Sequence, residues 1–290
     1  MHAAPMLIEG KLHDLGDGFT VRRMLPQLQA RHVGPFVFFD HMGPAHFAAG
    51  QGMDVRPHPH IGLATVTWLF EGAIRHRDSL GSCTDIHPGE LNWMTAGCGI
   101  VHSERTPPAV RRAGQTLHGV QIWVALPQAD AEIAPAFHHY RREALPTIRL
   151  PGVEAVLIAG DAWGQQAPVP VFGPMFLLDV QLAAGAELAL PQHHHERGVF
   201  VVDGAVGWGG LDVAATQMAV QAGPSAPPLR AHEASRVMLF GGAPLDGERQ
   251  LWWNFVAGSS GRIEQAKADW KAQRFPKVPG DEDEFIPLPA

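Results

Sequence analysis

Four side chains that can bind a metal occur in two closely spaced pairs. His58 and His60 form the first pair, and His102 and Glu104 repeat the same spacing further along the chain. Side chains two residues apart share one face of an extended strand. If the two strands face each other inside a barrel, three imidazoles and one carboxylate converge. Such a set suits a divalent ion of iron, nickel, copper or zinc.

The sequence between the two pairs has the pattern of short antiparallel strands. Within residues 64–70 the larger apolar side chains share one face, while Thr65 and Thr67 take the other. Turn signals follow at Glu71-Gly72, Gly81-Ser82 and Pro88-Gly89. Gly97 and Gly99 predict a tight bend just before His102. This pattern is typical of a β-sandwich or a β-barrel.

The motifs of this region resemble those of the pirin family, a branch of the cupins. The stretches that carry the resemblance are His58-Pro59-His60, Thr65-Val66-Thr67-Trp68, Pro88-Gly89-Glu90, Trp93-Met94-Thr95-Ala96-Gly97 and Gly99-Ile100-Val101-His102-Ser103-Glu104. The glutamate that usually follows the cupin histidine pair is absent, since Ala64 and Thr65 stand there. The second-motif histidine is also absent, because that region reads Asn92-Trp93. In pirins a later His-x-Glu replaces these ligands, and here it would be His102 and Glu104.

The resemblance implies an all-β fold with two cupin-type β-barrel (jelly-roll) domains in tandem, a bicupin, and a C-terminal α-helix. We expect an N-terminal cupin barrel with the metal site over residues 1–137. A degenerate C-terminal cupin barrel is expected over 138–258. Residues 259–290 are expected to form a helix and an extended tail that pack back on the barrels.

The second half of the chain looks like a degenerate repeat of the first. Residues 176–182 alternate as a strand, and the run His193-His194-His195-Glu196 follows. His193 and His195 would share a strand face, and His232 could supply a third imidazole. The spacing fits the first half poorly, however, and the run lies where a surface turn should begin. A second metal site at these residues is left open.

A helix is expected near the C-terminus, from about residue 260 to 273. Ile263, Ala266 and Trp270 recur at helical spacing, and Ser259 or Ser260 can cap the first turn. We expect the Trp270 face to pack on a barrel. The acidic tail after Pro276 should be solvated or lie along the N-terminal barrel.

Composition narrows the classes of protein that the chain can belong to. The net charge is −7 with no cluster of lysine and arginine, which argues against direct nucleic-acid binding. No apolar run has the length of a membrane span, and the first residues do not resemble a signal peptide. Two cysteines, Cys83 and Cys98, cannot form a disulfide framework, which favours the cytoplasm. We expect both thiols to be buried and inert.

Three further histidines lie near the predicted site. His41 and His46 are candidates for lining a pocket, and the aromatic residues just before His41 are expected to be core. His118 lies on an apolar, strongly β-prone stretch. It is either a pocket residue or a structural histidine.

The resemblance also implies an activity, because some bacterial pirins are described as quercetin 2,3-dioxygenases, which open a flavonol ring with release of carbon monoxide. On that basis His58, His60, His102 and Glu104 are the ligands of one divalent metal, with Fe(II) favoured. Nickel, copper and zinc remain alternatives, because imidazole suits all of them. Glu104 would also act as the catalytic base. The partners would be a small flavonoid-like aromatic substrate and O2.

Two other readings of the same ligand set remain. Pirins are also known as regulatory proteins whose iron redox state modulates binding to a transcription factor or a metabolic enzyme. The metal could instead only staple the barrel. An enzyme needs an apolar cavity above the metal that a sensor does not need.

Overall fold

The computed structural model describes residues 4–14 and 19–289, and its contacts divide the chain into two compact units. One unit comprises residues 1–11, 23–39 and 142–245. The other comprises residues 12–22, 40–141 and 246–290, and it contains all four predicted ligands. Both units are mainly β, as expected for a bicupin. The boundaries 1–137, 138–258 and 259–290 stay a prediction.

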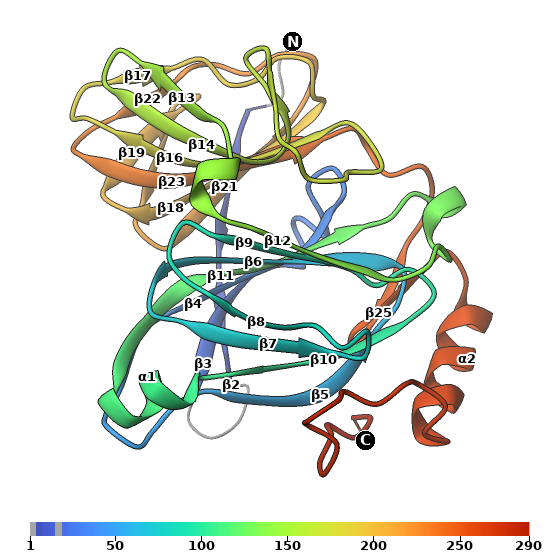
Figure 1. The fold of residues 1–290 in the computed structure, drawn as a ribbon. Coiled ribbons are helices and arrows are strands. Elements are labelled where there is room, and N and C mark those ends of the chain that lie inside the picture. Colours follow the sequence, from blue (N-terminus) through green and yellow to red (C-terminus); the bar gives the residue numbers. More distant parts are fainter. Residues whose placement is uncertain (1–3, 15–18, 290) are drawn as a thin grey trace. The chain divides into compact units, whose positions relative to one another are not determined.

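Two antiparallel sheets form the part of the chain around the predicted ligands, and both strands that carry these ligands lie in the smaller sheet (Figure 1). The larger sheet contains, in spatial order, β12 (Ala136–Tyr140), β9 (Leu91–Thr95), β6 (Leu63–Glu71), β11 (Gln115–Ala125), β4 (Phe36–Phe47), β3 (Thr20–Leu25) and β2 (Lys11–Asp14). The smaller sheet contains β5 (Asp54–His60), β10 (Ile100–Arg105), β7 (Ile74–Asp78) and β8 (Cys83–Ile86). Figure 1 shows β6 and β11 in one layer and β5, β10 and β7 in the other.

Glycines make the turns that the sequence predicted. Gly72 joins β6 to β7 at φ 85°, and Gly97 and Gly99 precede β10 at φ 51° and 154°. A side chain at any of these positions would be strained, because only glycine adopts such backbone angles readily. The short helix α1 (Pro108–Ala113) then links β10 to β11, and the 3₁₀ turn η1 (Gln128–Asp130) follows β11.

The C-terminal helix α2 (Ser260–Lys271) agrees with the expected helix. The Ser259 hydroxyl caps it by accepting a hydrogen bond from the Arg262 amide. Its buried residues are Ile263, Ala266 and Trp270, as predicted. They form an apolar cluster with Ile61, Val101 and residues of the hairpin β24 (Gln250–Trp252) and β25 (Phe255–Ala257).

The acidic tail lies along β5 and β10, which is one of the two expected arrangements. The Ile286 amide donates to the Pro57 carbonyl, and Trp270 Nε1 donates to the Ile286 carbonyl. Arg105 on β10 forms ion pairs with Asp281 at 2.7 Å and Glu284 at 2.7 Å. These contacts hold the tail against the strands that carry the predicted ligands.

The unit that lacks the predicted ligands, residues 1–11, 23–39 and 142–245, contains an eight-stranded and a four-stranded antiparallel sheet. The larger one contains β1 (Met6–Glu9), β21 (Gln217–Ala222), β18 (Glu196–Asp203), β23 (Ser235–Gly242), β16 (Met175–Leu182), β14 (Val153–Ala162) and β13 (Thr147–Leu150), with β15 (Gln165–Gln166) paired to β14. The smaller one contains β17 (Glu187–Leu188), β22 (Leu229–Ala231), β19 (Ala205–Trp208) and β20 (Leu211–Ala214). The 3₁₀ turn η2 (Arg142–Ala144) precedes β13.

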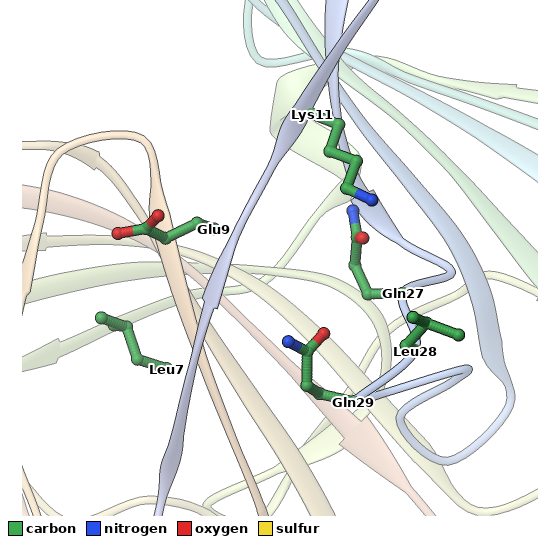
Figure 2. Close-up of a pocket in the computed structure, with 6 residues that line it drawn as sticks. All are labelled: Leu7, Glu9, Lys11, Gln27, Leu28 and Gln29. Carbon is green, nitrogen blue, oxygen red and sulfur yellow. The ribbon is translucent and has the colours of Figure 1, made fainter.

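A hollow of about 340 Å³ lies between β1 and the loop at residues 27–29 (Figure 2). The side chains that line it are Leu7, Glu9, Lys11, Gln27, Leu28 and Gln29. They bring together no imidazole and no thiol, and the two charged groups among them have opposite sign. The hollow therefore offers no set of ligands for a transition metal.

The two cysteines lie at the surface of the protein. Cys83 and Cys98 are free and both are exposed, so the prediction of buried thiols was wrong. Cys83 begins the edge strand β8 and Cys98 lies in the glycine bend, where little packs over either residue.

Among the described residues, no helix has the length and apolarity needed to cross a membrane.

Gly62 offers a test of the packing just after β5. A methyl group there would collide with the Val256 carbonyl oxygen, whereas one at Gly81 would meet open space. Both glycines have positive φ, 69° and 92°, so alanine strains both by about 1–2 kcal/mol. We expect Gly62→Ala to lower the free energy of unfolding by roughly a further 1–3 kcal/mol. Equal losses for Gly62→Ala and Gly81→Ala in urea unfolding would contradict this packing.

Candidate metal centre

The pairing of β5 with β10 places the two ligand pairs side by side. His58 is the direct partner of His102 in this antiparallel ladder. The strands are neighbours in one sheet, whereas the convergence predicted from the sequence supposed that they face each other inside a barrel. The three imidazoles still converge, because side chains opposite each other on one face of paired strands lie close together.

Three buried imidazoles meet at this place. A ligand nitrogen of each of His58, His60 and His102 lies within 4.8 Å of the other two. The Nε2 atoms of His60 and His102 are 3.1 Å apart. The three residues are 7%, 1% and 1% exposed. They form the one group of three or more close metal-ligand side chains among the described residues.

Backbone carbonyls fix the tautomers of two of these rings. His58 Nδ1 donates to the Arg56 carbonyl at 2.9 Å, and His60 Nδ1 donates to the Asn254 carbonyl at 3.2 Å. A carbonyl oxygen can only accept, so each Nδ1 carries hydrogen and each neutral ring keeps its lone pair on Nε2. Asn254 lies at the turn of the β24–β25 hairpin, directly after Trp253, whose φ is 52°.

Burial keeps all three rings neutral. Desolvation is the largest cause that lowers the pKa of His58 to about 4 and the pKa values of His60 and His102 well below the usual range. The neighbouring imidazoles lower them further, because positive charges at this distance repel. A neutral imidazole is the form that binds a metal.

The donor set fits a divalent transition metal. Metal to nitrogen distances are about 2.0–2.1 Å, so two nitrogens at a right angle around one ion lie about 2.8–3.0 Å apart. His60 Nε2 and His102 Nε2 are separated by 3.1 Å. A single proton between these two nitrogens would bind only the lone pairs of His60 and His102. A metal cation can bind a nitrogen lone pair from all three histidines. The site thus has the composition and spacing of a three-histidine metal centre.

Glu104 lies on β10, as His102 does, but outside the group of mutually close ligand atoms found among the described residues. Its carboxyl is buried and accepts hydrogen bonds from Gln121 Nε2, at 3.2 and 3.3 Å. The Thr67 hydroxyl lies 3.2 Å from Glu104 Oε1 and 2.8 Å from Gln121 Oε1. Glu104 Oε1 therefore shares the hydroxyl hydrogen of Thr67 with a closer acceptor.

A hydroxyl has only one hydrogen, so Thr67 can serve fully just one of its two neighbours. If Thr67 donates its hydrogen to Gln121 Oε1, the contact between Thr67 and Glu104 is a hydrogen bond only when Glu104 is protonated and donates to the Thr67 hydroxyl oxygen. Burial is the largest influence on the Glu104 carboxyl and raises its pKa, which favours that proton. The Thr67 and Gln121 hydrogen bonds and nearby His76 act in the opposite direction. The carboxyl is thus placed where it can hold or release a proton beside the imidazoles.

Several residues at the centre were missed in the sequence analysis. His76 on β7 lies beside His102, with ring centroids 5.3 Å apart, and its Nε2 donates to the buried Asp78 at 3.0 Å. His76 and Asp78 have the same two-residue spacing as His58 and His60, which was a usable signal. Trp123 contacts the His60 ring edge to face at 5.1 Å. Thr67, Gln121 and Asn254 carried no comparable signal, because their role depends on tertiary contacts.

The other candidate histidines are not part of this group. His41 Nε2 and His118 Nε2 form their own contact at 2.8 Å, and burial together with His118 lowers the pKa of His41 to about 3. His46 is exposed. In the other unit His193 and His195 are exposed and His232 Nε2 pairs with Asp212 at 2.8 Å. The described residues form no three-ligand group there.

Comparison with known proteins assigns the family. Residues 18–124 match the family model described as Pirin, and residues 177–276 match the one described as Pirin C-terminal cupin domain. A pirin-like protein of Caulobacter vibrioides is 49% identical over 287 residues, which cover 98% of this chain and 99% of the relative.

Two solved structures agree in fold. The crystal structure of a quercetin 2,3-dioxygenase from Acinetobacter baumannii matches with TM-score 0.91 at 34% identity, covering 99% of this chain and 95% of that chain. A second structure with the same name from that organism matches with TM-score 0.87 at 27% identity, covering 95% and 98%. The chain therefore belongs to the pirin family and is a bicupin whose first cupin domain contains the three-imidazole cluster.

Proposed function

We propose that this pirin is a metal-dependent dioxygenase that cleaves a flavonol or a related aromatic enol such as quercetin. The observation that carries the proposal is the convergence of three neutral, buried imidazoles, with the buried carboxyl group of Glu104 two residues after His102 on β10. The likeness to proteins named quercetin 2,3-dioxygenase supports the choice of substrate class.

His58, His60 and His102 would hold one divalent ion, with Glu104 as a fourth ligand. Fe(II) is our choice, and nickel, copper and zinc share the same ligand chemistry. When bound, the ion would act as a Lewis acid for the oxygens of an enolate and would bring the substrate together with dioxygen. The carbonyls of Arg56 and Asn254 hold two of the rings in the tautomer that this requires.

Glu104 would take the proton from the substrate hydroxyl. The Thr67 hydroxyl and the Gln121 side-chain amide both lie within hydrogen-bond distance of its carboxyl group. Burial raises its pKa, so the carboxylate becomes a better proton acceptor than an exposed glutamate. The buried Trp123 ring against His60 and the half-buried Phe137 ring stacked on His76 help to exclude water.

The reaction needs only a small aromatic molecule and O2 as partners, and we place it in the cytoplasm. The two free cysteines support a reducing compartment. A redox-dependent regulatory role would instead need a protein partner.

Loss of one imidazole should remove the metal. In His58→Ala or His102→Ala we expect the affinity for Fe(II) to fall by more than the roughly 100-fold that loss of an outer hydrogen-bond partner costs. Elemental analysis after desalting measures this, with His118→Ala as the control that leaves the three-imidazole cluster intact. Stoichiometric iron in either alanine variant would refute the ligand set.

The proposed reaction can be followed directly. Metal-free protein is loaded with Fe(II) without oxygen and then given quercetin in air. We expect the flavonol absorbance to fall and carbon monoxide to be released. Glu104→Gln should still take up one iron at saturating metal but lose kcat by about 10²–10⁴-fold, because an amide accepts no proton. The absence of turnover in wild-type protein with full iron occupancy would contradict the dioxygenase and favour the regulatory role.

The metal-free protein should lose stability in mild acid. The pKa values of His41, His58, His60 and His102 are lowered in the folded state, so below about pH 6.5 the unfolded chain binds more protons. Each such histidine contributes up to about 1.4 kcal/mol per pH unit between its unfolded and folded pKa values. We expect the urea midpoint to be steady near pH 7.5 and to fall from pH 6.5 to 5. A constant midpoint over this range would show that the rings are protonated in the folded protein.

A further inference from the structure

We propose that Gln121, together with Thr67, is a positioning residue that holds the Glu104 carboxyl group in place at the three-imidazole cluster. The inference rests on the proposed metal site, in which Glu104 is the fourth ligand. It concerns two uncharged side chains that cannot themselves act as a base.

Strand pairing brings Thr67 and Gln121 together. They are direct partners in the antiparallel ladder of β6 and β11, so their side chains leave the same face of the larger sheet. Glu104 comes from β10 in the smaller sheet. The polar pair therefore reaches from one layer to a carboxyl group on the other.

The hydrogen bonds restrict the carboxyl group in two ways. Gln121 Nε2 lies 3.3 and 3.2 Å from Oε1 and Oε2 of Glu104, so one amide group spans both carboxyl oxygens. The Gln121 amide is in turn held by Thr67 at 2.8 Å. Glutamate has several freely rotating bonds, and a two-point contact of this kind selects one rotamer among many.

A purely structural role does not account for these residues. Thr67 is 3% exposed and Glu104 is 8% exposed, and valine would fill the place of Thr67 without bringing a polar group into the interior. The buried Thr67 hydroxyl and the half-buried Gln121 amide are stabilising only when they have partners. Here those partners are each other and Glu104, which ties the pair to the proposed ligand.

Binding of Co(II) alone tests the proposal, because its visible absorption reports the ligands and geometry of the site. Gln121→Met and Thr67→Val are each measured in two backgrounds, with Glu104 and with Glu104→Gln. With Glu104 present we expect each change to weaken Co(II) binding by about tenfold. The spectrum should shift toward that of Glu104→Gln. In the Glu104→Gln background we expect less than about a twofold further loss, because the group being positioned is already gone.

Two matched controls separate positioning from general damage. Thr65 lies on the same strand as Thr67 and is equally buried at 3%, so Thr65→Val should bind Co(II) like the wild type. Thr67→Ser keeps the hydroxyl and should restore wild-type affinity and spectrum. Thermal unfolding of each metal-free variant shows that it is folded.

The outcomes are distinct. Unchanged Co(II) affinity and spectrum in Gln121→Met, or the same loss in both backgrounds, would overturn the positioning role while leaving the metal site intact. Failure of wild-type protein to bind one Co(II) would refute the metal site, and the positioning role with it.

Discussion

The register between β5 and β10 is the constraint on which the centre depends. Setting His58 opposite His102 brings imidazoles from two strands together at the distance of ligands around one ion. A slip of one residue would turn every side chain of one strand to the opposite face. The glycine bend before β10 and the tail held to β5 and β10 both act on this pairing.

Burying polar groups is costly unless they have partners. His102 Nδ1 has no hydrogen-bond partner among the described residues, whereas Nδ1 of His58 and of His60 each has one. Burial costs an imidazolium more than an imidazole, so the rings are neutral and keep lone pairs that can bind a cation. The Arg56 and Asn254 carbonyls then decide which nitrogen carries the hydrogen. The same requirement explains the ring formed by Thr67, Gln121 and Glu104, in which uncharged donors surround a buried carboxyl group. The proposed metal binding and the proposed proton transfer thus depend on one desolvated environment.

Segments from the end of the chain complete the candidate metal centre, whose proposed ligands lie in the first half of the chain. His60 is bonded to Asn254, which is 194 residues away in sequence. The hairpin that presents Asn254 packs in the same apolar cluster as α2. Arg105, next to Glu104, is paired with two acidic residues of the tail. The C-terminal residues are therefore part of the support for the proposed metal site.

The sequence by itself determined the all-β class, the pirin resemblance and the two pairs of candidate ligands, because strand alternation, glycine turns and histidine spacing are local properties. It also located α2, whose cap and apolar face lie within a few residues of one another. Tertiary structure alone decided that β5 and β10 are neighbours, that Glu104 is bonded to Thr67 and Gln121, and that Asn254 orients His60. It also corrected the burial of Cys83 and Cys98. These features arise from contacts between residues far apart in the chain, and local sequence patterns do not specify which distant groups will meet.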